Sequence, residues 1–144
     1  MASRIRASAT PDEVWHVLCD PWLYASWVVG SSRIRDVDEH WPNEGSRFHH
    51  SIGLWPLLDN DYTEVVSCDP GRMIELAAHS WPAGKARVRL GLTKEPEGCE
   101  IVLEEWVDSW PWKAIPKRVQ EKLAAPRNRE CLRRLALIAE GRHE

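Results

Sequence analysis

The chain has 144 residues and a formal net charge of −3, and no segment approaches the ~20 consecutive apolar residues of a membrane span. A chain of this length forms one domain and can bury roughly 68–70% of the surface that its unfolded form exposes. The small negative charge argues against nonspecific binding to nucleic acid or acidic membranes, which needs a clearly positive surface. We therefore expect one soluble domain over residues 1–144, with no nucleic-acid partner and no integral membrane association.

The cysteines are spaced as free thiols. The four cysteines, at positions 19, 68, 99 and 131, form no CxxC pair and have no neighbouring histidine at zinc spacing. The first residues, MASRIRASATPDE, contain no apolar segment of the kind found in a secretory signal. No nucleophile elbow, G-x-G-x-x-G motif or P-loop is present. We therefore predict a cytoplasmic protein with no cofactor and no metal site.

Tryptophan is unusually frequent, with nine residues against a single phenylalanine. Each tryptophan is large and keeps an N–H group that needs a hydrogen-bond partner. Such residues suit the wall or rim of a cavity, and they can equally fill a core, so both interpretations stay open. The candidates for a cavity or its rim are Trp27, Trp55, Trp81 and Trp106, although strict strand alternation places Trp106 outside.

Two helix-start signals lie close together near the N-terminus. Thr10 and Glu13 form a capping box around Pro11, and the helix behind them has an apolar face. Asp20 and Pro21 then give a second start, because aspartate caps helices well and proline fits the first turn. We predict two short helices joined at an angle, which must pack on a later part of the chain.

The middle of the chain predicts an antiparallel meander. Turn signals, such as the DPGR stretch at residues 69–72, separate short runs of strand-forming residues. Short turns join antiparallel neighbours, because parallel pairs need long crossovers. Alternation assigns one apolar face to most of these strands, but two sets of residues compete in the strand at 62–68, whose facing stays open. The predicted strands are residues 32–38, 46–52, 62–68, 73–80, 86–92 and 100–107.

The C-terminal segment can cover the apolar face of that sheet. From Pro126 onward, apolar residues recur at helical spacing, at Leu132, Leu135, Ala136 and Ala139. The prolines at 111 and 116 indicate a loop and a shorter helix before this long one. Residues 113–134 hold eight lysines or arginines and only two glutamates. We interpret this basic stretch as a solvated helix face.

The order of elements and several stretches together resemble a known superfamily. The stretches are SATPDEVWHVLCDPWLYASWVVG, GSRF, SCDPGRMIELAA, EGCEIVLEE and RNRECLRRLALIAEG. They are similar to the START-like, helix-grip (SRPBCC) superfamily, and within it to the polyketide cyclase/dehydrase and lipid-transport group. The resemblance spans nearly the whole chain. It implies an α+β fold in which a curved antiparallel sheet wraps around the C-terminal helix and encloses an apolar cavity.

Two residues could do acid–base chemistry in such a cavity. Alternation places Glu105 on the face shared by Ile101 and Leu103, where apolar surroundings would make it a candidate general acid or base. Glu105 can instead be wetted at the open end of the strand, or paired with an arginine. His50 shares a face with Phe48, and can either reach the cavity or be hydrogen-bonded within the sheet.

Three functions remain open. The first is binding of a small hydrophobic or aromatic ligand, lipid-like or polyketide-like, by a carrier or sensor. The second is a cyclase or dehydratase that uses Glu105 and His50. The third is a protein-interaction module that uses Trp110 and Trp112. The chain can be a monomer or a homodimer. The predicted ligand-binding residues are Trp27, Phe48, His50, Tyr62, Leu76, Ala78, Leu90, Ile101, Leu103, Glu105, Leu132 and Leu135.

Overall fold

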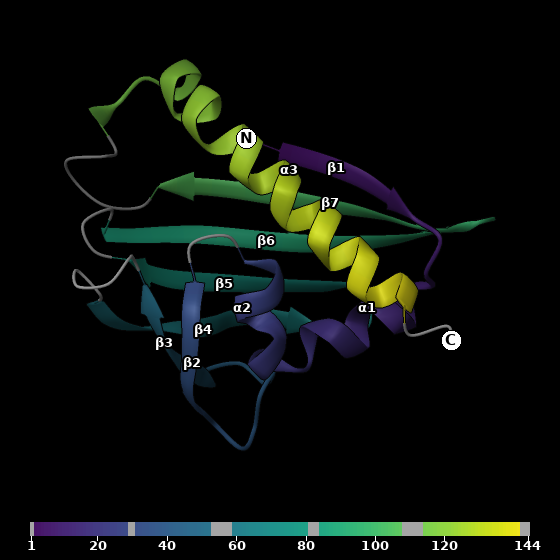
Figure 1. Ribbon diagram of the computed structural model, residues 1–144, viewed down its shortest axis with the longest axis horizontal. Coiled ribbons are helices and arrows are strands. Elements are labelled where there is room, and N and C mark those ends of the chain that lie inside the picture. Colours follow the sequence, from purple (N-terminus) through teal and green to yellow (C-terminus); the bar gives the residue numbers. More distant parts are fainter. Residues whose placement is uncertain (1, 29–30, 53–58, 81–83, 108–113, 142–144) are drawn as a thin grey trace.

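The computed structural model describes residues 2–28, 31–52, 59–80, 84–107 and 114–141. Within these ranges the strands form one antiparallel sheet in the order β1-β7-β6-β5-β4-β3-β2 (Figure 1). All six strands expected from the sequence are present. The strands are β1 (Ala2–Ala7), β2 (Ser31–Val37), β3 (Arg47–Ile52), β4 (Asp59–Asp69), β5 (Met73–Ser80), β6 (Gly84–Glu95) and β7 (Gly98–Val107).

One long helix and three short helical segments lie against this sheet. Figure 1 shows α3 crossing one face of the sheet, with α1 and α2 on the same side. α3 contacts β1, α1 and α2, which places it across the β1 side of the sheet. This is the expected helix-grip arrangement. The segments are α1 (Pro11–Leu18), the 3₁₀ segment η1 (Pro21–Leu23), α2 (Tyr24–Trp27) and α3 (Lys117–Gly141).

The paired start signals near the N-terminus are confirmed. The Thr10 hydroxyl accepts a hydrogen bond from the Glu13 amide at 3.2 Å, and the Glu13 carboxylate accepts one from the Thr10 amide at 3.0 Å. The Asp20 carboxylate then accepts a hydrogen bond from the Trp22 amide at 3.2 Å. These caps satisfy amide groups that the first helical turn leaves unpaired. The break lets both short pieces turn buried residues toward the core.

The sequence analysis missed β1. This strand pairs antiparallel with β7, with Ile5 opposite Ile101 and Ala7 opposite Cys99. Arg4 and Arg6 alternate with Ile5 and Ala7, so the period-two pattern of a half-buried strand was present in the sequence. The strand was not predicted because it is short and carries two arginines. β1 matters for the fold because it forms the edge of the sheet against which α3 lies.

A β-bulge decides the facing of β4. Thr63 and Val65 are buried, and Val65 lies opposite Leu76 on the covered face. The register then shifts between Val65 and Ser67, and beyond the shift Cys68 pairs with Ile74. A bulge inserts one extra residue, so the residues beyond it change face relative to strict alternation. The covered face therefore combines Thr63 and Val65, before the bulge, with Cys68, after it.

The long helix starts earlier than expected. The sequence analysis placed its start at Pro126, whereas α3 runs through this proline without interruption from Lys117. Proline favours the first turn of a helix, and inside one it removes a single backbone hydrogen bond and crowds the carbonyl four residues earlier. That local defect does not end a helix that has turns on both sides. The separate shorter helix expected before Pro126 is therefore the N-terminal part of α3.

The core lies between the sheet and the helices. The predicted apolar positions Leu76, Leu90, Ile101 and Leu103 are all at most 4% exposed, and so are the four predicted positions on α3. None of the helices within the described ranges combines the length and hydropathy that crossing a membrane would require.

The turn between β6 and β7 depends on one glycine. Gly98 has φ +152°, and a methyl group added there would overlap the carbonyl of Ala7 in β1. We expect Gly98→Ala to lower the free energy of unfolding by about 2 kcal/mol or more. The cost of the unfavourable φ for alanine and the cost of the overlap between its methyl group and the Ala7 carbonyl both contribute. Urea unfolding measures this change.

Gly91 is the matched control, since it lies in the same hairpin and has open space around its Cα. Gly91→Ala should change the free energy of unfolding by less than about 0.5 kcal/mol. Equal effects of the two substitutions would contradict the assigned packing of β1 on the turn.

Candidate functional site

The inward face of the sheet is incompletely covered. Ala78, Ala86 and Val88 point to the same face as the buried Leu76, yet all three remain partly exposed. Val88 lies directly opposite Glu105 across β6 and β7. These small apolar side chains are not buried, so they leave accessible apolar surface on the inward face, next to the carboxylate of Glu105 at Val88. Such surface is typical of small-molecule sites, in which a few polar groups interrupt an apolar wall.

Glu105 is buried and ion-paired. Its side chain is 10% exposed, and one carboxylate oxygen, Oε2, lies 2.6 Å from Nη2 of Arg127 on α3. Of the alternatives open in the sequence, the structure therefore shows pairing with an arginine. The other oxygen, Oε1, accepts no hydrogen bond from the described residues. The ion pair joins the inward face of β7 to α3 and leaves one acceptor position unused.

Asn128 adds a polar group to the inward face of α3, and the sequence analysis missed it. The residue is 1% exposed and lies four positions before the buried Leu132, so it occupies the first place of the apolar stripe. Its Oδ1 accepts a weak hydrogen bond from Arg127 at 3.4 Å. Its Nδ2 group has no hydrogen-bond partner. The signal in the sequence was an asparagine at a stripe position where an apolar residue was expected.

A second polar feature lies among aromatic rings near α2. The ring centroids of Tyr24 and Trp27 are 4.7 Å apart, and those of Tyr24 and Phe48 are 4.6 Å apart. The Tyr24 hydroxyl and Trp27 Nε1 are buried and have no hydrogen-bond partner. Burial raises the pKa of the Tyr24 phenol, so it stays protonated at neutral pH. Trp27 and Phe48 are therefore core residues, and Trp27 retains an unused donor.

Tyr62, which was expected at the ligand site, lies on the outer face of the sheet. It lies opposite His49 in the register of β3 and β4, whereas Phe48 lies opposite Thr63. The Arg47 guanidinium sits 4.5 Å from the Tyr62 ring centroid, in a cation–π contact. Because the bulge was not foreseen, the two faces of β4 could not be separated. We therefore remove Tyr62 from the ligand site.

Some expected residues lie outside what the structure describes. Trp55, Trp81, Trp110 and Trp112 fall outside the described ranges, and the side chain of His50 is likewise not described. The backbone of His50 pairs with Ile34 and Asp61.

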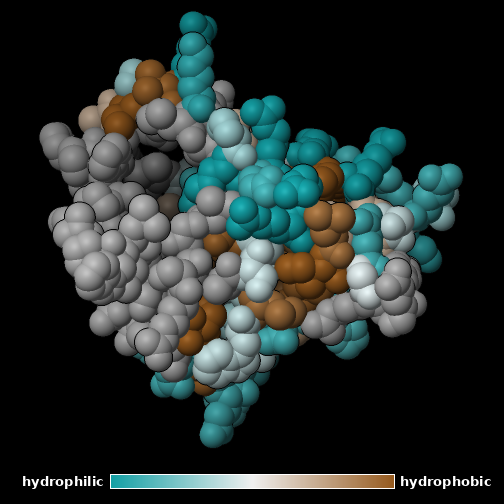
Figure 2. Space-filling model, in the orientation of Figure 1, coloured by the Kyte–Doolittle hydropathy of each residue, from teal (hydrophilic) through white to brown (hydrophobic). Residues whose placement is uncertain are grey.

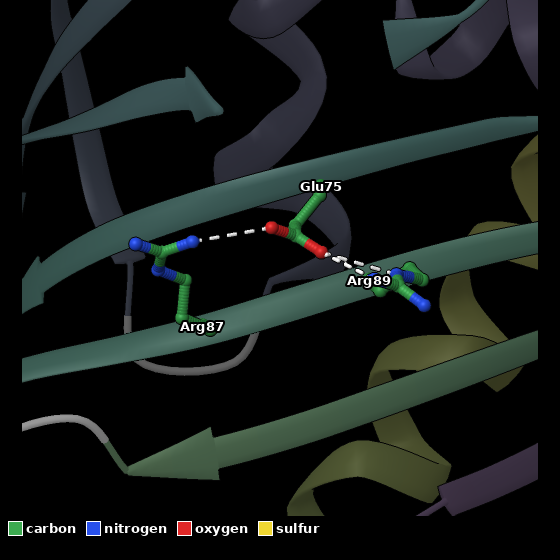
Figure 3. Close-up of polar contacts among 3 residues, drawn as sticks. All are labelled: Glu75, Arg87 and Arg89. Atoms are coloured by element: carbon green, nitrogen blue, oxygen red, sulfur yellow. Dashed lines mark hydrogen bonds and ion pairs between the residues drawn. The ribbon is translucent and has the colours of Figure 1, made fainter. Parts of the chain in front are cut away.

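The outer face of the sheet holds the second buried carboxylate among the described residues. Glu75 on β5 is 7% exposed and is bound by two arginines of β6 (Figure 3). Arg89 donates to Oε1 from Nε at 3.1 Å and from Nη2 at 2.8 Å, while Arg87 donates to Oε2 at 3.2 Å. Both oxygens are used, so this cluster joins neighbouring strands. Trp106, expected outside, does lie on this face, 38% exposed and near Arg89.

A cleft of about 510 Å³ lies at the opposite end of the sheet from Glu105, beside the turn between β6 and β7. Its charged groups are largely paired with one another. Arg6 lies 3.5 Å from Glu95, and the Glu140 carboxylate accepts hydrogen bonds from the amide and hydroxyl of Ser8. Paired charges in an open cleft do not indicate a binding site.

The cysteines are not arranged for catalysis or metal binding. None of these four described cysteines forms a disulfide, as expected. Burial raises the pKa of Cys19 and Cys68, and burial with nearby carboxylates raises that of Cys99 to about 11. A raised thiol pKa disfavours the reactive thiolate. Among the residues that the structure describes, no three histidine, cysteine or acidic side chains cluster as metal ligands would.

An antiparallel sheet that wraps around a long C-terminal helix defines a helix-grip protein of the α+β class. The sequence profile described as "Polyketide cyclase / dehydrase and lipid transport" matches residues 1–140. The chain belongs to this family. No curated protein sequence matches the chain significantly.

Solved structures share the fold at low sequence identity. Protein NE0264 from Nitrosomonas europaea has a TM-score of 0.76 at 12% identity, covering 99% of this chain and 95% of that one. The di-domain ARO/CYC StfQ from the steffimycin biosynthetic pathway has a TM-score of 0.76 at 14% identity, covering 99% and 51%. The Zhui aromatase/cyclase from a Streptomyces species has a TM-score of 0.71 at 14% identity, covering 100% and 94%. Likeness at this level shows the fold alone.

The ion pair between Glu105 and Arg127 should be measurable in stability. We expect Arg127→Met to lower the free energy of unfolding by about 1–2 kcal/mol, because it leaves a buried carboxylate unpaired while Arg127 itself is partly solvated. Glu105→Gln should cost less. In a double-mutant cycle followed by urea unfolding, the pair should show a coupling energy of about 1 kcal/mol. Additive single effects would contradict the pairing.

Proposed function

We propose that the protein binds a small hydrophobic or aromatic ligand between α3 and the inward face of the sheet, as a carrier or sensor. The observation that supports this most directly is the partly exposed apolar surface of Ala78, Ala86 and Val88, which faces inward beside Glu105. Apolar surface that stays in contact with water on the inward side of a fold lowers stability unless another apolar group covers it. A ligand is the occupant that the family also favours, since its description includes lipid transport.

The surroundings of this surface fit such a ligand. The aliphatic residues also expected at the site are at most 3% exposed and pack in the core behind this surface; they are Leu90, Ile101, Leu103, Leu132 and Leu135. Figure 2 shows that apolar surface also reaches the exterior beside the charged residues over α3. The polar groups near the surface are few, which is the usual composition of a small-molecule site. Leu76 and Ala78 remain ligand-binding candidates, and so do Trp27 and Phe48 at the α2 side.

A second candidate function is a cyclase or dehydratase. It is favoured by the inward-facing Glu105, whose Oε1 is unused and could exchange a proton with a bound polyketone. Two structural neighbours are named as an ARO/CYC and as an aromatase/cyclase, which adds support by analogy of fold. His50 stays the proposed partner in this reaction. The interaction-module hypothesis has no support from the described residues, because Trp110 and Trp112 lie outside them.

Filling the accessible surface should block binding. We expect Ala78→Phe to weaken binding of the neutral dye Nile red at least tenfold, because the added ring occupies the space beside Ala86 and Val88. Fluorescence titration of the purified protein gives the dissociation constants. Native mass spectrometry should in parallel show a small apolar molecule retained by the wild-type chain and lost from the variant.

The neighbouring residue supplies the control. Ala77 precedes Ala78 on β5 and therefore faces the opposite side of the sheet, so Ala77→Phe should leave Nile red affinity within about threefold of wild type. Equal loss of affinity in both variants would point to general disruption. Failure of the wild-type protein to bind any neutral apolar dye would contradict the proposal.

Turnover separates the carrier from the cyclase. If Glu105 transfers protons, Glu105→Gln should reduce the rate of cyclisation of a model polyketone by about 10²–10⁴-fold while changing its dissociation constant only modestly. Product formation is followed by liquid chromatography. If wild-type protein binds the polyketone but does not accelerate its cyclisation, the enzymatic alternative is rejected and the carrier remains.

A further inference from the structure

We propose that Asn128 and Arg127 select a neutral ligand that presents a hydrogen-bond acceptor oxygen, such as a carbonyl, next to Glu105. This inference rests on the proposed function, because it names the polar group that the ligand must carry. It assigns a specificity role to two residues of α3.

The polar groups at this place have more donors than acceptors. Asn128 Nδ2 is enclosed by protein and has no partner, and Arg127 uses only Nη2 for its contacts with Glu105 and Asn128. An unpaired buried amide group is rare in native proteins, which pair nearly all such groups. Arg127 Nη2 contacts both Glu105 and Asn128, and the partly exposed Val88 lies opposite Glu105 in the sheet. A ligand that covers this surface could supply the missing acceptor.

The orientation of the Asn128 amide is chemically constrained. Its Oδ1 lies 3.4 Å from the Arg127 guanidinium, which can only donate hydrogen bonds. Rotating the amide by 180° would place two donors against each other. Oδ1 therefore belongs on the Arg127 side, and Nδ2 is the group left to bind an acceptor. Asn128 is therefore a hydrogen-bond donor toward the ligand.

The charge of the site favours a neutral ligand. Arg127 carries one positive charge, and the Glu105 carboxylate at 2.6 Å balances it. A ligand carboxylate at Asn128 would bring a second negative charge close to Glu105, and two carboxylates sharing a buried site repel each other. A carbonyl oxygen accepts the same hydrogen bonds without adding charge. Discrimination between the two follows from Glu105, which thereby acts as a selector against anions.

The stripe position of Asn128 allows a clean test. Leucine has nearly the shape of asparagine and matches the apolar residues that follow on the same face of α3, at Cys131, Leu132, Leu135 and Ala136. Asn128→Leu removes an unpaired polar group, so the variant should unfold at a temperature no lower than wild type. A loss of ligand selectivity in this variant therefore cannot be attributed to unfolding.

Three probes of matched shape distinguish the outcomes: 2-acetylnaphthalene, 2-isopropenylnaphthalene, in which a CH₂ group replaces the carbonyl oxygen, and the 2-naphthoate anion. Isothermal titration calorimetry at pH 7 gives their dissociation constants. We expect wild type to bind the ketone about tenfold more tightly than the alkene, a difference of about 1.4 kcal/mol. Naphthoate should bind at least tenfold more weakly than the ketone.

The variants locate the selectivity. Asn128→Leu should bind the ketone and the alkene about equally, and its alkene affinity should stay within about threefold of wild type. In Arg127→Met the preference for the ketone over the alkene should fall at least threefold. Arg129→Met is the matched control, because Arg129 is exposed on the next position of α3, and it should retain the tenfold preference. Glu105→Gln should improve naphthoate binding at least fivefold relative to the ketone.

The possible failures are distinguishable. Equal binding of ketone and alkene by wild type, or an unchanged preference in Asn128→Leu, would overturn the assignment of Asn128 while leaving the proposed function intact. Tighter binding of naphthoate than of the ketone would overturn the neutral-ligand inference. If none of the three probes binds, the proposed function itself fails.

Discussion

The packing of α3 on the β1 side of the sheet is the constraint on which the rest of the structure depends. Its inward stripe, from Cys131 to Ala139, is buried against the sheet and α1. Each fully buried leucine contributes about 1.5–3 kcal/mol relative to exposure, so Leu132 and Leu135 alone fix the helix firmly at its C-terminal half. Because α3 leans toward this edge, the inward surfaces of β5 and β6 are left with small and partly exposed residues such as Ala78 and Ala86.

Much of this arrangement could be predicted from the sequence. The capping box, the second start at Asp20 and the strand alternation are local signals, and each produces its structure through contacts within a few residues. The stripe from Leu132 to Ala139 likewise follows from helical periodicity. The family resemblance adds the long-range arrangement that local signals cannot supply. These elements agree with one another, which is the condition for a sequence to specify one fold.

The parts that could not be predicted depend on partners far away in the sequence. β1 is a short, charged strand whose pairing with β7 is decided about a hundred residues later. The bulge in β4 has no local signature, and the outward facing of Tyr62 is set by the register of β4 with β3. The ion pair of Glu105 with Arg127 joins a strand to a helix across 22 positions of the sequence, and no local rule specifies such a contact. Tertiary packing overrides local preference at each of these places.

The two buried carboxylates illustrate how structural and functional polar groups differ. Glu75 has both oxygens bound by Arg87 and Arg89 on the outer face, so its charge is fully compensated and nothing is left to bind. Glu105 has one bound oxygen, and Asn128 nearby has an unused amide. A polar group that serves the fold alone tends to be satisfied within it, since an unpaired one lowers stability. Among the described residues, the buried groups without a hydrogen-bond partner are Asn128 Nδ2, the Tyr24 hydroxyl and Trp27 Nε1, and the ligand proposed above would supply the acceptor that is missing at Asn128.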